Sequence, residues 1–300
     1  MATTHPIRQT VEKLTNNHST TYPYIPLHER RIPTASRIQE IMATIHAIVF
    51  PGYSGASIVN EDSLVYHTGV YVEKLYNLLS LQILDALFFE TLESETVSAR
   101  EKACKITYAF LETLPHIKYM LSTDVKAMFN SDPAAKSYDE VIFCYPAIRA
   151  ILNYRIAHEL YLMEVPVLPR VISELAHSDT GIDIHPGAQI GEYFSIDHGT
   201  GVVIGQTTII GKYVTLYQGV TLGAKSFVLD SEGHPMDVPR HPIIEDRVTI
   251  YSNSSILGRI TIGHNTIIGG NIWLTSSVPA YSRILQTKAV SLDLTDGAGI

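Results

Sequence analysis

The sequence predicts an α+β fold: an N-terminal α-helical domain followed by a left-handed parallel β-helix with one extruded loop. Two observations predict it. Aliphatic residues recur every six positions between Ile184 and Leu274, and apolar residues recur at helical spacing before about residue 178. A fixed six-residue period fits neither a helix nor a single strand, and it indicates short strands stacked into triangular coils. The handedness is the one that proteins with such repeats adopt.

The β-helix is predicted over residues 179–279. Each six-residue step would form one short strand with its turn, about 20 Å long at 3.3 Å per residue, and three steps would complete a coil. A β-sandwich with this spacing by chance is a much weaker explanation. The period is carried by thirteen aliphatic positions, which would all point into the coil: Ile184, Ile190, Ile196, Ile204, Ile210, Leu216, Leu222, Ile244, Ile250, Ile256, Ile262, Ile268 and Leu274.

Two breaks in the period indicate where chemistry is expected. The step from Ile196 to Ile204 is eight residues, which inserts two residues within 197–201. The step from Leu222 to Ile244 is 22 residues, so a loop over about 224–242 is extruded from the coil. Insertions in a solenoid collect on one face, and this face often binds ligands.

The rest of the chain is read as helices with irregular ends. Helices are predicted over about 34–50, 69–90, 95–114, 116–130 and 139–163, with Pro115 ending the third. Residues 1–33 contain four prolines and predict an irregular N-terminal arm, while the tail 280–300 is predicted to be flexible. We therefore expect three parts, 1–178, 179–279 and 280–300. The apolar stripes of such helices usually form a bundle core or an oligomer face.

Composition argues against several functional classes. The net charge is −8 with no basic block, which argues against nucleic acid as the main partner. No apolar run reaches the ~18 residues of a membrane span, and the N-terminus lacks a signal-peptide pattern. Two cysteines in 300 residues indicate a reducing compartment. We therefore expect a cytoplasmic protein with neither nucleic acid nor a membrane as partner.

Several polar residues near the breaks suit acid–base chemistry. Asp183 and His198 are 15 residues apart, so they would lie on neighbouring corners of successive coils. A carboxylate bound to one imidazole nitrogen leaves the other nitrogen as a general base, and a substrate hydroxyl then needs no protein nucleophile. Arg240, where the loop rejoins the coil, suits a bidentate contact with a carboxylate. Considered one at a time, His198 and Arg240 could equally be ordinary surface residues, and Asp132 is interpreted first as a cap or turn residue.

Several motifs, in order along the chain, carry a resemblance to a known family. They are Ser131-Asp132-Pro133-Ala134, Tyr154-Arg155-Ile156-Ala157-His158, Asp183-Ile184-His185-Pro186, Asp197-His198-Gly199-Thr200-Gly201 and Arg240-His241-Pro242. Together they resemble the serine O-acetyltransferases, hexapeptide-repeat acyltransferases of cysteine biosynthesis. The resemblance spans about residues 130–275. Hexapeptide repeats alone occur in many acyltransferases, but this ordered set across two domains is specific.

The resemblance implies transfer of an acetyl group from acetyl-CoA to the hydroxyl of L-serine, without a metal. It implies that His198 is the general base and that Asp183 is its orienting carboxylate. The serine carboxylate would be held by Arg240 with His241 beside it. The serine ammonium would be held by two acids, Asp132 and Asp197.

Cofactor contacts and partners follow from the same resemblance. Backbone groups near four small residues would contact acetyl-CoA: Gly223, Ala224, Ser252 and Gly270. L-cysteine would inhibit by competing at the serine site. The assembly would be a homotrimer, with a hexamer of two trimers left open. The terminal Ile300 resembles the tail that family members insert into O-acetylserine sulfhydrylase.

Three other readings stay open at this point. Another hexapeptide O-acetyltransferase, acting on a sugar or an antibiotic hydroxyl, would use the same chemistry; Asp132 and Arg240 favour an amino acid instead. A zinc hydrolyase would need three neutral imidazoles around a metal, and the spacings give no close histidine pair. A solenoid scaffold without enzymatic activity would leave the Asp and His residues at the break unexplained.

Overall fold

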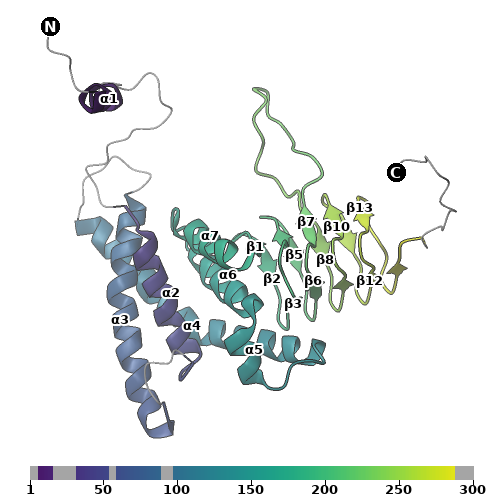
Figure 1. The fold of residues 1–300 in the computed structure, drawn as a ribbon, viewed down its shortest axis with the longest axis horizontal. Helices are drawn as coiled ribbons and strands as arrows, with labels where there is room; N and C mark the ends of the chain where they lie inside the picture. Colours follow the sequence, from purple (N-terminus) through teal and green to yellow (C-terminus); the bar gives the residue numbers. More distant parts are fainter. Residues whose placement is uncertain (1–5, 16–31, 54–58, 89–96, 288–300) are drawn as a thin grey trace. The chain divides into compact units, whose positions relative to one another are not determined.

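The computed structural model describes residues 6–15, 32–53, 59–88 and 97–287 (Figure 1). Its contacts divide the chain into two compact units, Met1–Ile32 and Pro33–Ile300. The first unit contains α1 (Pro6–Thr15), a helix where the sequence predicts an irregular arm. Pro6 stands in the first helical turn, where its missing N–H costs little. The prediction weighed the prolines and overlooked the helical spacing of Ile7, Val11 and Leu14.

In the described residues of the second unit, six helices precede the coil. They are α2 (Ala35–Val49), α3 (Glu61–Leu87), α4 (Val97–Ser131), α5 (Tyr138–Cys144), α6 (Pro146–Leu162) and α7 (Leu168–Thr180). In the described residues, no helix is both long and apolar enough to cross a membrane.

Several helix boundaries differ from the sequence prediction, among them the start of α3, which lies at Glu61 and not at about residue 69. Helix α4 continues through Pro115, because buried apolar residues on both sides of the proline, among them Leu114 and Ile117, pack it into the helical core. The predicted helix over 139–163 is instead divided into α5 and α6. Tyr145 at the division is extended, with φ −81° and ψ 119°, as expected for a residue that precedes a proline.

Three parallel sheets follow, and up to β13 each contains every third strand of the chain. Sheet A contains β1 (Asp183–Ile184), β4 (Val203–Ile204), β7 (Thr221–Gly223), β10 (Ser255–Leu257) and β13 (Trp273–Leu274). Sheet B contains β2 (Gln189–Ile190), β5 (Ile209–Ile210), β8 (Ile243–Ile244) and β11 (Thr261–Ile262). Sheet C contains β3 (Ser195–Asp197), β6 (Thr215–Tyr217), β9 (Thr249–Ile250), β12 (Ile267–Ile268) and β14 (Arg283–Ile284).

This arrangement confirms the predicted fold class, helices followed by a parallel β-helix. We name the turns of the prism by the sheets they join: the AB, BC and CA edges. The six-residue period marks the inward positions, since Ile184 through Ile268 in the predicted series are at most 8% exposed and Leu274 in the last coil is half-buried. The packed interior leaves the edges to carry polar residues.

The coil also extends beyond its predicted end at residue 279. Strand β14 pairs with β12 in sheet C, and Val278 forms a parallel bridge with Ile262 of sheet B. The sequence period is lost there because Leu274 and Ile284 are separated by ten residues, yet the stacking continues. Of the predicted flexible tail, residues 288–300, including Ile300, lie outside the described residues. The helix-to-strand change between Thr180 and Asp183 falls close to the predicted boundary, but whether the two parts are separate domains stays a prediction.

A buried ion pair fastens the helices to the first coil. Arg155 of α6 donates to both carboxylate oxygens of Asp124 on α4, at 2.6 and 2.8 Å. The same guanidinium donates to the carbonyl of Gly191 at 3.0 Å, and the N–H of Phe194 donates to Asp124 at 3.1 Å. The carboxyl end of α4, and with it Asp132, is therefore held close to β3.

Candidate active site

The first break in the period places His198 outside the coil. His198 directly follows β3 and lies in the left-handed region, with φ 58°, and Gly199 comes next with φ 83°. A side chain at Gly199 would approach Ile182 Cδ1 to 2.5 Å, so this tight turn requires glycine. The imidazole is 73% exposed at the CA edge, with Nε2 3.8 Å from Asp197 Oδ1. The two-residue insertion thus presents an accessible imidazole beside a carboxylate.

Asp132 joins this group from the helical region. It directly follows α4, and the N–H of Ala134 donates to its Oδ1 at 2.8 Å. The hydroxyl of Tyr145 donates to Oδ2. These two hydrogen bonds, with a smaller contribution from nearby His198, lower the pKa of Asp132 below its ordinary value. The structure therefore brings Asp132, Asp197 and His198 together, and Asp132 is ionised at neutral pH.

Two tyrosines of this group were missed in the sequence. The hydrogen bond to Asp132 raises the pKa of Tyr145 to about 12. Burial, followed by Tyr251, Asp197 and Asp132, raises the pKa of Tyr217. The β3–β6 register pairs Asp197 with Tyr217. Tyr217 follows Asp197 by one coil with the two inserted residues, so its place beside Asp197 could have been predicted from the sequence. For Tyr145 the only signal in the sequence was the proline that follows it.

The second break places Arg240 and His241 on the AB edge. The guanidinium of Arg240 donates to Gln206 Oε1 at 2.6 Å and to Asp237 Oδ1 at 3.1 Å. The imidazole of His241 is buried against Gly205, where an added Cβ would lie 2.0 Å from ring atom Cδ2. The absence of a side chain at position 205 is thus what admits the ring.

Two histidines at the AB edge are held neutral. Burial, followed by cationic neighbours, lowers the pKa of His185 and of His241 to about 4. In each ring, Nδ1 lies where it accepts a backbone N–H, from Gly187 at 2.9 Å and from Thr207 at 3.1 Å. The proton of a neutral ring then resides on Nε2. The AB edge therefore offers a guanidinium and neutral N–H donors, which suits an anion.

The acidic CA edge and the cationic AB edge are separated within one chain. Sheet A lies between them, and one six-residue step spans about 20 Å at 3.3 Å per residue. The contacts of the described residues join Asp132, Asp197 and His198 in one cluster and Arg240 and His241 in another, with none linking the two. A single amino acid cannot reach both clusters in one protomer.

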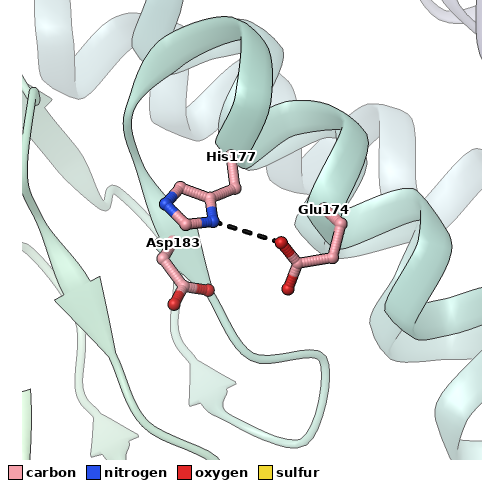
Figure 2. Close-up of side chains that lie close together, drawn as sticks. All are labelled: Glu174, His177 and Asp183. Carbon is pink, nitrogen blue, oxygen red and sulfur yellow. Dashed lines mark hydrogen bonds and ion pairs between the residues drawn. The ribbon is translucent and has the colours of Figure 1, made fainter.

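Asp183 lies apart from His198 in the described contacts. Figure 2 shows it beside Glu174 and His177 of α7, where a carboxylate oxygen or ring nitrogen of each lies within 4.8 Å of the others. His177 Nδ1 is 3.2 Å from Glu174 Oε2. The orienting role of Asp183 toward His198 therefore stays a prediction. This cluster contains one histidine, which differs from the three imidazoles of the zinc hydrolyase alternative.

The residues predicted to contact acetyl-CoA fall at both edges of sheet A. Ser252 and Gly270 are neighbours on successive coils at the CA edge, where a Cβ on Gly270 would lie 3.3 Å from the carbonyl oxygen of Ser252. Gly223 ends β7, and Ala224 follows it into the extruded loop at the AB edge. The carbonyls of Gly223 and Ser252 accept the N–H groups of Gly258 at 2.9 Å and of Asn271 at 2.8 Å within the coil, so contact of these residues with acetyl-CoA stays a prediction.

No protein-family model matches the chain. The chain is 45% identical over 275 residues to the plasmid serine acetyltransferase of Synechococcus elongatus, covering 90% of this chain and 86% of that protein. It is 47% identical over 165 residues to the serine acetyltransferase of Staphylococcus xylosus, covering 55% of this chain and 73% of the relative. The first similarity extends well into the N-terminal helices, beyond the motifs recognised in the sequence.

Solved structures agree with these relatives. Serine acetyltransferase isoform 3 of Entamoeba histolytica, in complex with cysteine, has a TM-score of 0.71 at 29% identity, covering 96% of this chain and 93% of the other. Serine acetyltransferase of Neisseria gonorrhoeae, in complex with serine, has a TM-score of 0.54 at 27% identity, covering 84% and 97%. Because a relative named serine acetyltransferase is 45% identical over 90% of this chain, the chain belongs to the serine acetyltransferase family.

Proposed function

We propose that the protein transfers the acetyl group of acetyl-CoA to the hydroxyl of L-serine, giving O-acetyl-L-serine and CoA. The observation that carries this proposal is the pair of oppositely charged clusters. Asp132 and Asp197 suit an ammonium, and Arg240 with His241 suits a carboxylate, so together they match a small amino acid. A sugar or antibiotic hydroxyl would leave one cluster without a partner, and the relatives are named serine acetyltransferases.

His198 acts as the general base in this proposal. Its imidazole takes the proton of the serine hydroxyl while the oxygen bonds to the thioester carbonyl carbon. The carbon–sulfur bond then breaks, and the imidazolium returns its proton to the leaving thiolate, so no acyl-enzyme forms. A positioned base of this kind contributes about 10²–10⁴-fold. Holding both substrates in one groove contributes further, up to about 7–11 kcal/mol.

The complete site needs two copies of the chain. Because the two clusters lie at different edges of one prism, they meet when the CA edge of one protomer faces the AB edge of the next. Such a head-to-tail contact closes into a ring, which fits a homotrimer. A hexamer of two trimers joined through the N-terminal helices stays a prediction. The inferred groove between protomers also explains why the four small residues proposed to contact acetyl-CoA lie on both edges of sheet A.

L-cysteine is proposed as a feedback inhibitor that competes with serine. It presents the same carboxylate and ammonium to Arg240 and Asp132. The Entamoeba relative crystallised with cysteine supports this proposal. Binding of O-acetylserine sulfhydrylase to the terminal Ile300 stays a separate prediction, to be tested by removing this residue and measuring pull-down of the sulfhydrylase.

The direct test is release of CoA thiol from acetyl-CoA in the presence of L-serine. We expect turnover with serine, inhibition by L-cysteine, and relief of the inhibition by excess serine. His198→Ala should lower kcat by orders of magnitude while the coil remains folded. Turnover with a hexose but not with serine would reject the proposal, and inhibition by cysteine that serine cannot relieve would reject a shared site.

A further inference from the structure

Thr207 lies in the turn between β4 and β5, on the AB edge. Its hydroxyl oxygen accepts the backbone N–H groups of Arg240 at 2.9 Å and of His241 at 3.1 Å. It also lies 2.9 Å from Nδ1 of the His241 ring. The backbone N–H of Thr207 donates to the same Nδ1 at 3.1 Å. One residue therefore contacts both the backbone and the side chain of the proposed carboxylate-binding pair.

These contacts use the full capacity of the threonine hydroxyl. A hydroxyl has two lone pairs and one proton. The lone pairs accept the N–H groups of Arg240 and His241, and the proton is directed to Nδ1 of His241. With a second donor, the Thr207 N–H, on Nδ1, the ring carries its own proton on Nε2. Valine in place of threonine would remove three of these contacts at almost unchanged volume.

Arg259 secures the same junction from the neighbouring coil. Its Nη1 donates to the carbonyl of Thr207 at 2.6 Å and to the carbonyl of His241 at 2.9 Å. The junction is where the extruded loop returns to the coil, and backbone pairing with β5 begins only at the carbonyl of Pro242, which accepts the N–H of Ile209 at 3.1 Å. Side-chain contacts must therefore set where Arg240 and His241 stand relative to the coil.

We propose that Thr207 is a positioning residue for the serine site: its hydroxyl and N–H place Arg240 and fix His241 as a neutral Nε2–H donor toward the substrate carboxylate. The identity of this ligand rests on the function proposed above. The placement of the two side chains does not, because it follows from contacts within the chain.

The kinetic test compares Thr207→Val with Thr207→Ser. Serine retains the hydroxyl, and valine retains the shape. Loss of hydrogen bonds at a charged site predicts that Thr207→Val raises KM for L-serine about tenfold or more. KM for acetyl-CoA should change less than about twofold, and Thr207→Ser should stay within about threefold of the parent enzyme. Thermal unfolding and gel filtration confirm that both variants remain folded and assembled. Equal KM for serine in Thr207→Val and the parent, or an equal defect in both variants, overturns the proposal.

A second readout needs no activity. Protein labelled with ¹⁵N-histidine reports the tautomer of each ring by NMR, and His241→Gln assigns the signal. We expect His241 to carry its proton on Nε2 and to stay neutral as pH is lowered toward its pKa of about 4. In Thr207→Val only the backbone N–H still donates to Nδ1, so the Nε2–H tautomer should be less strongly favoured than in the parent and the ring should protonate at higher pH. A parent ring with its proton on Nδ1 overturns the positioning role. A fixed Nε2–H ring in a protein inactive toward serine would instead reject the proposed function and leave the positioning role standing.

Discussion

Asp124→Asn removes the charge that pairs with Arg155 at the junction of helices and coil. The two side chains are 0% and 6% exposed, and Arg155 also donates to the carbonyls of Ile190 and Gly191. After the substitution, the guanidinium stays buried without its counter-charge. Breaking a buried ion pair in this way costs about 3–5 kcal/mol. The new side-chain amide also brings N–H groups to a place where Asp124 accepts hydrogen bonds from Arg155 and from the N–H of Phe194, so donors would face donors.

The assay is urea unfolding followed by circular dichroism. Protomer concentration is kept equal for all variants, because unfolding of an oligomer depends on it. The matched control is Asp179→Asn, which breaks the exposed pair of Arg149 and Asp179 at 3.1 Å. An exposed pair contributes about 0–1 kcal/mol, so the control should unfold close to the parent protein.

A double variant separates the charge from the packing. Asp124→Leu combined with Arg155→Met replaces the ion pair with apolar groups and should cost less than Asp124→Asn alone, because no charge is left unpaired. If Asp124→Asn lowers the free energy of unfolding by no more than Asp179→Asn, the buried pair does not hold the helices on the coil as argued here.

Three further outcomes follow from the site. Gly205→Ala should displace the His241 ring, which an added Cβ would meet at 2.0 Å, and raise KM for serine with little change in unfolding; an unchanged KM would contradict this packing. Tyr145→Phe removes the main contact that lowers the pKa of Asp132, so kcat/KM for serine should fall about tenfold in steady-state assays. A decrease of less than about twofold would show that Tyr145 does not belong to the site. In the unfolded chain a histidine has a pKa of about 6.5, whereas burial lowers the pKa of His185 and of His241 to about 4 in the folded protein. Between these pH values the unfolded state binds more protons, so the free energy of unfolding should fall as pH is lowered from 6.5 to 4. His185→Asn should flatten this dependence in urea midpoints, and an equally steep variant would refute the assignment.

The coil was predictable because its interior allows little choice. Each inward position must be aliphatic to pack on its equivalents one coil away, so the period alone identifies strands and sheets. The two breaks likewise identified the edges that carry His198 and Arg240, since extra residues in a coil have no place inside it. Where the period failed, after Leu274, the prediction ended the coil too early, because stacking through Val278 does not need a six-residue step.

The partners of the site residues were less predictable. The contact of Thr207 with His241 joins residues 34 apart across a loop whose length no period fixes. Tyr145 reaches Asp132 because a proline divides α5 from α6, which the apolar pattern of that stretch conceals. Spacing predicts Asp183 for His198, which stays a prediction, but spacing could not predict that Glu174 and His177 lie beside Asp183, because this contact depends on how α7 packs against β1. Contacts between helices and coil depend on how the two parts dock, which sequence spacing does not encode.

The central claim is that the two clusters form one site between neighbouring protomers. His198→Ala removes the function of one edge, and Arg240→Ala removes that of the other. Each variant alone should be inactive toward L-serine. In trimers assembled from equal amounts of both, an intact site forms where the CA edge of an Arg240→Ala chain meets the AB edge of a His198→Ala chain, which is about one interface in four.

The decisive measurement is therefore the thiol-release activity of such mixed trimers, co-expressed with two different tags and purified through both. Purification through both tags removes trimers of a single variant, so each remaining trimer has one intact interface in three, and we expect about a third of the parent turnover. Mixed trimers as inactive as their components would show that a single chain carries the whole site, and they would contradict the account.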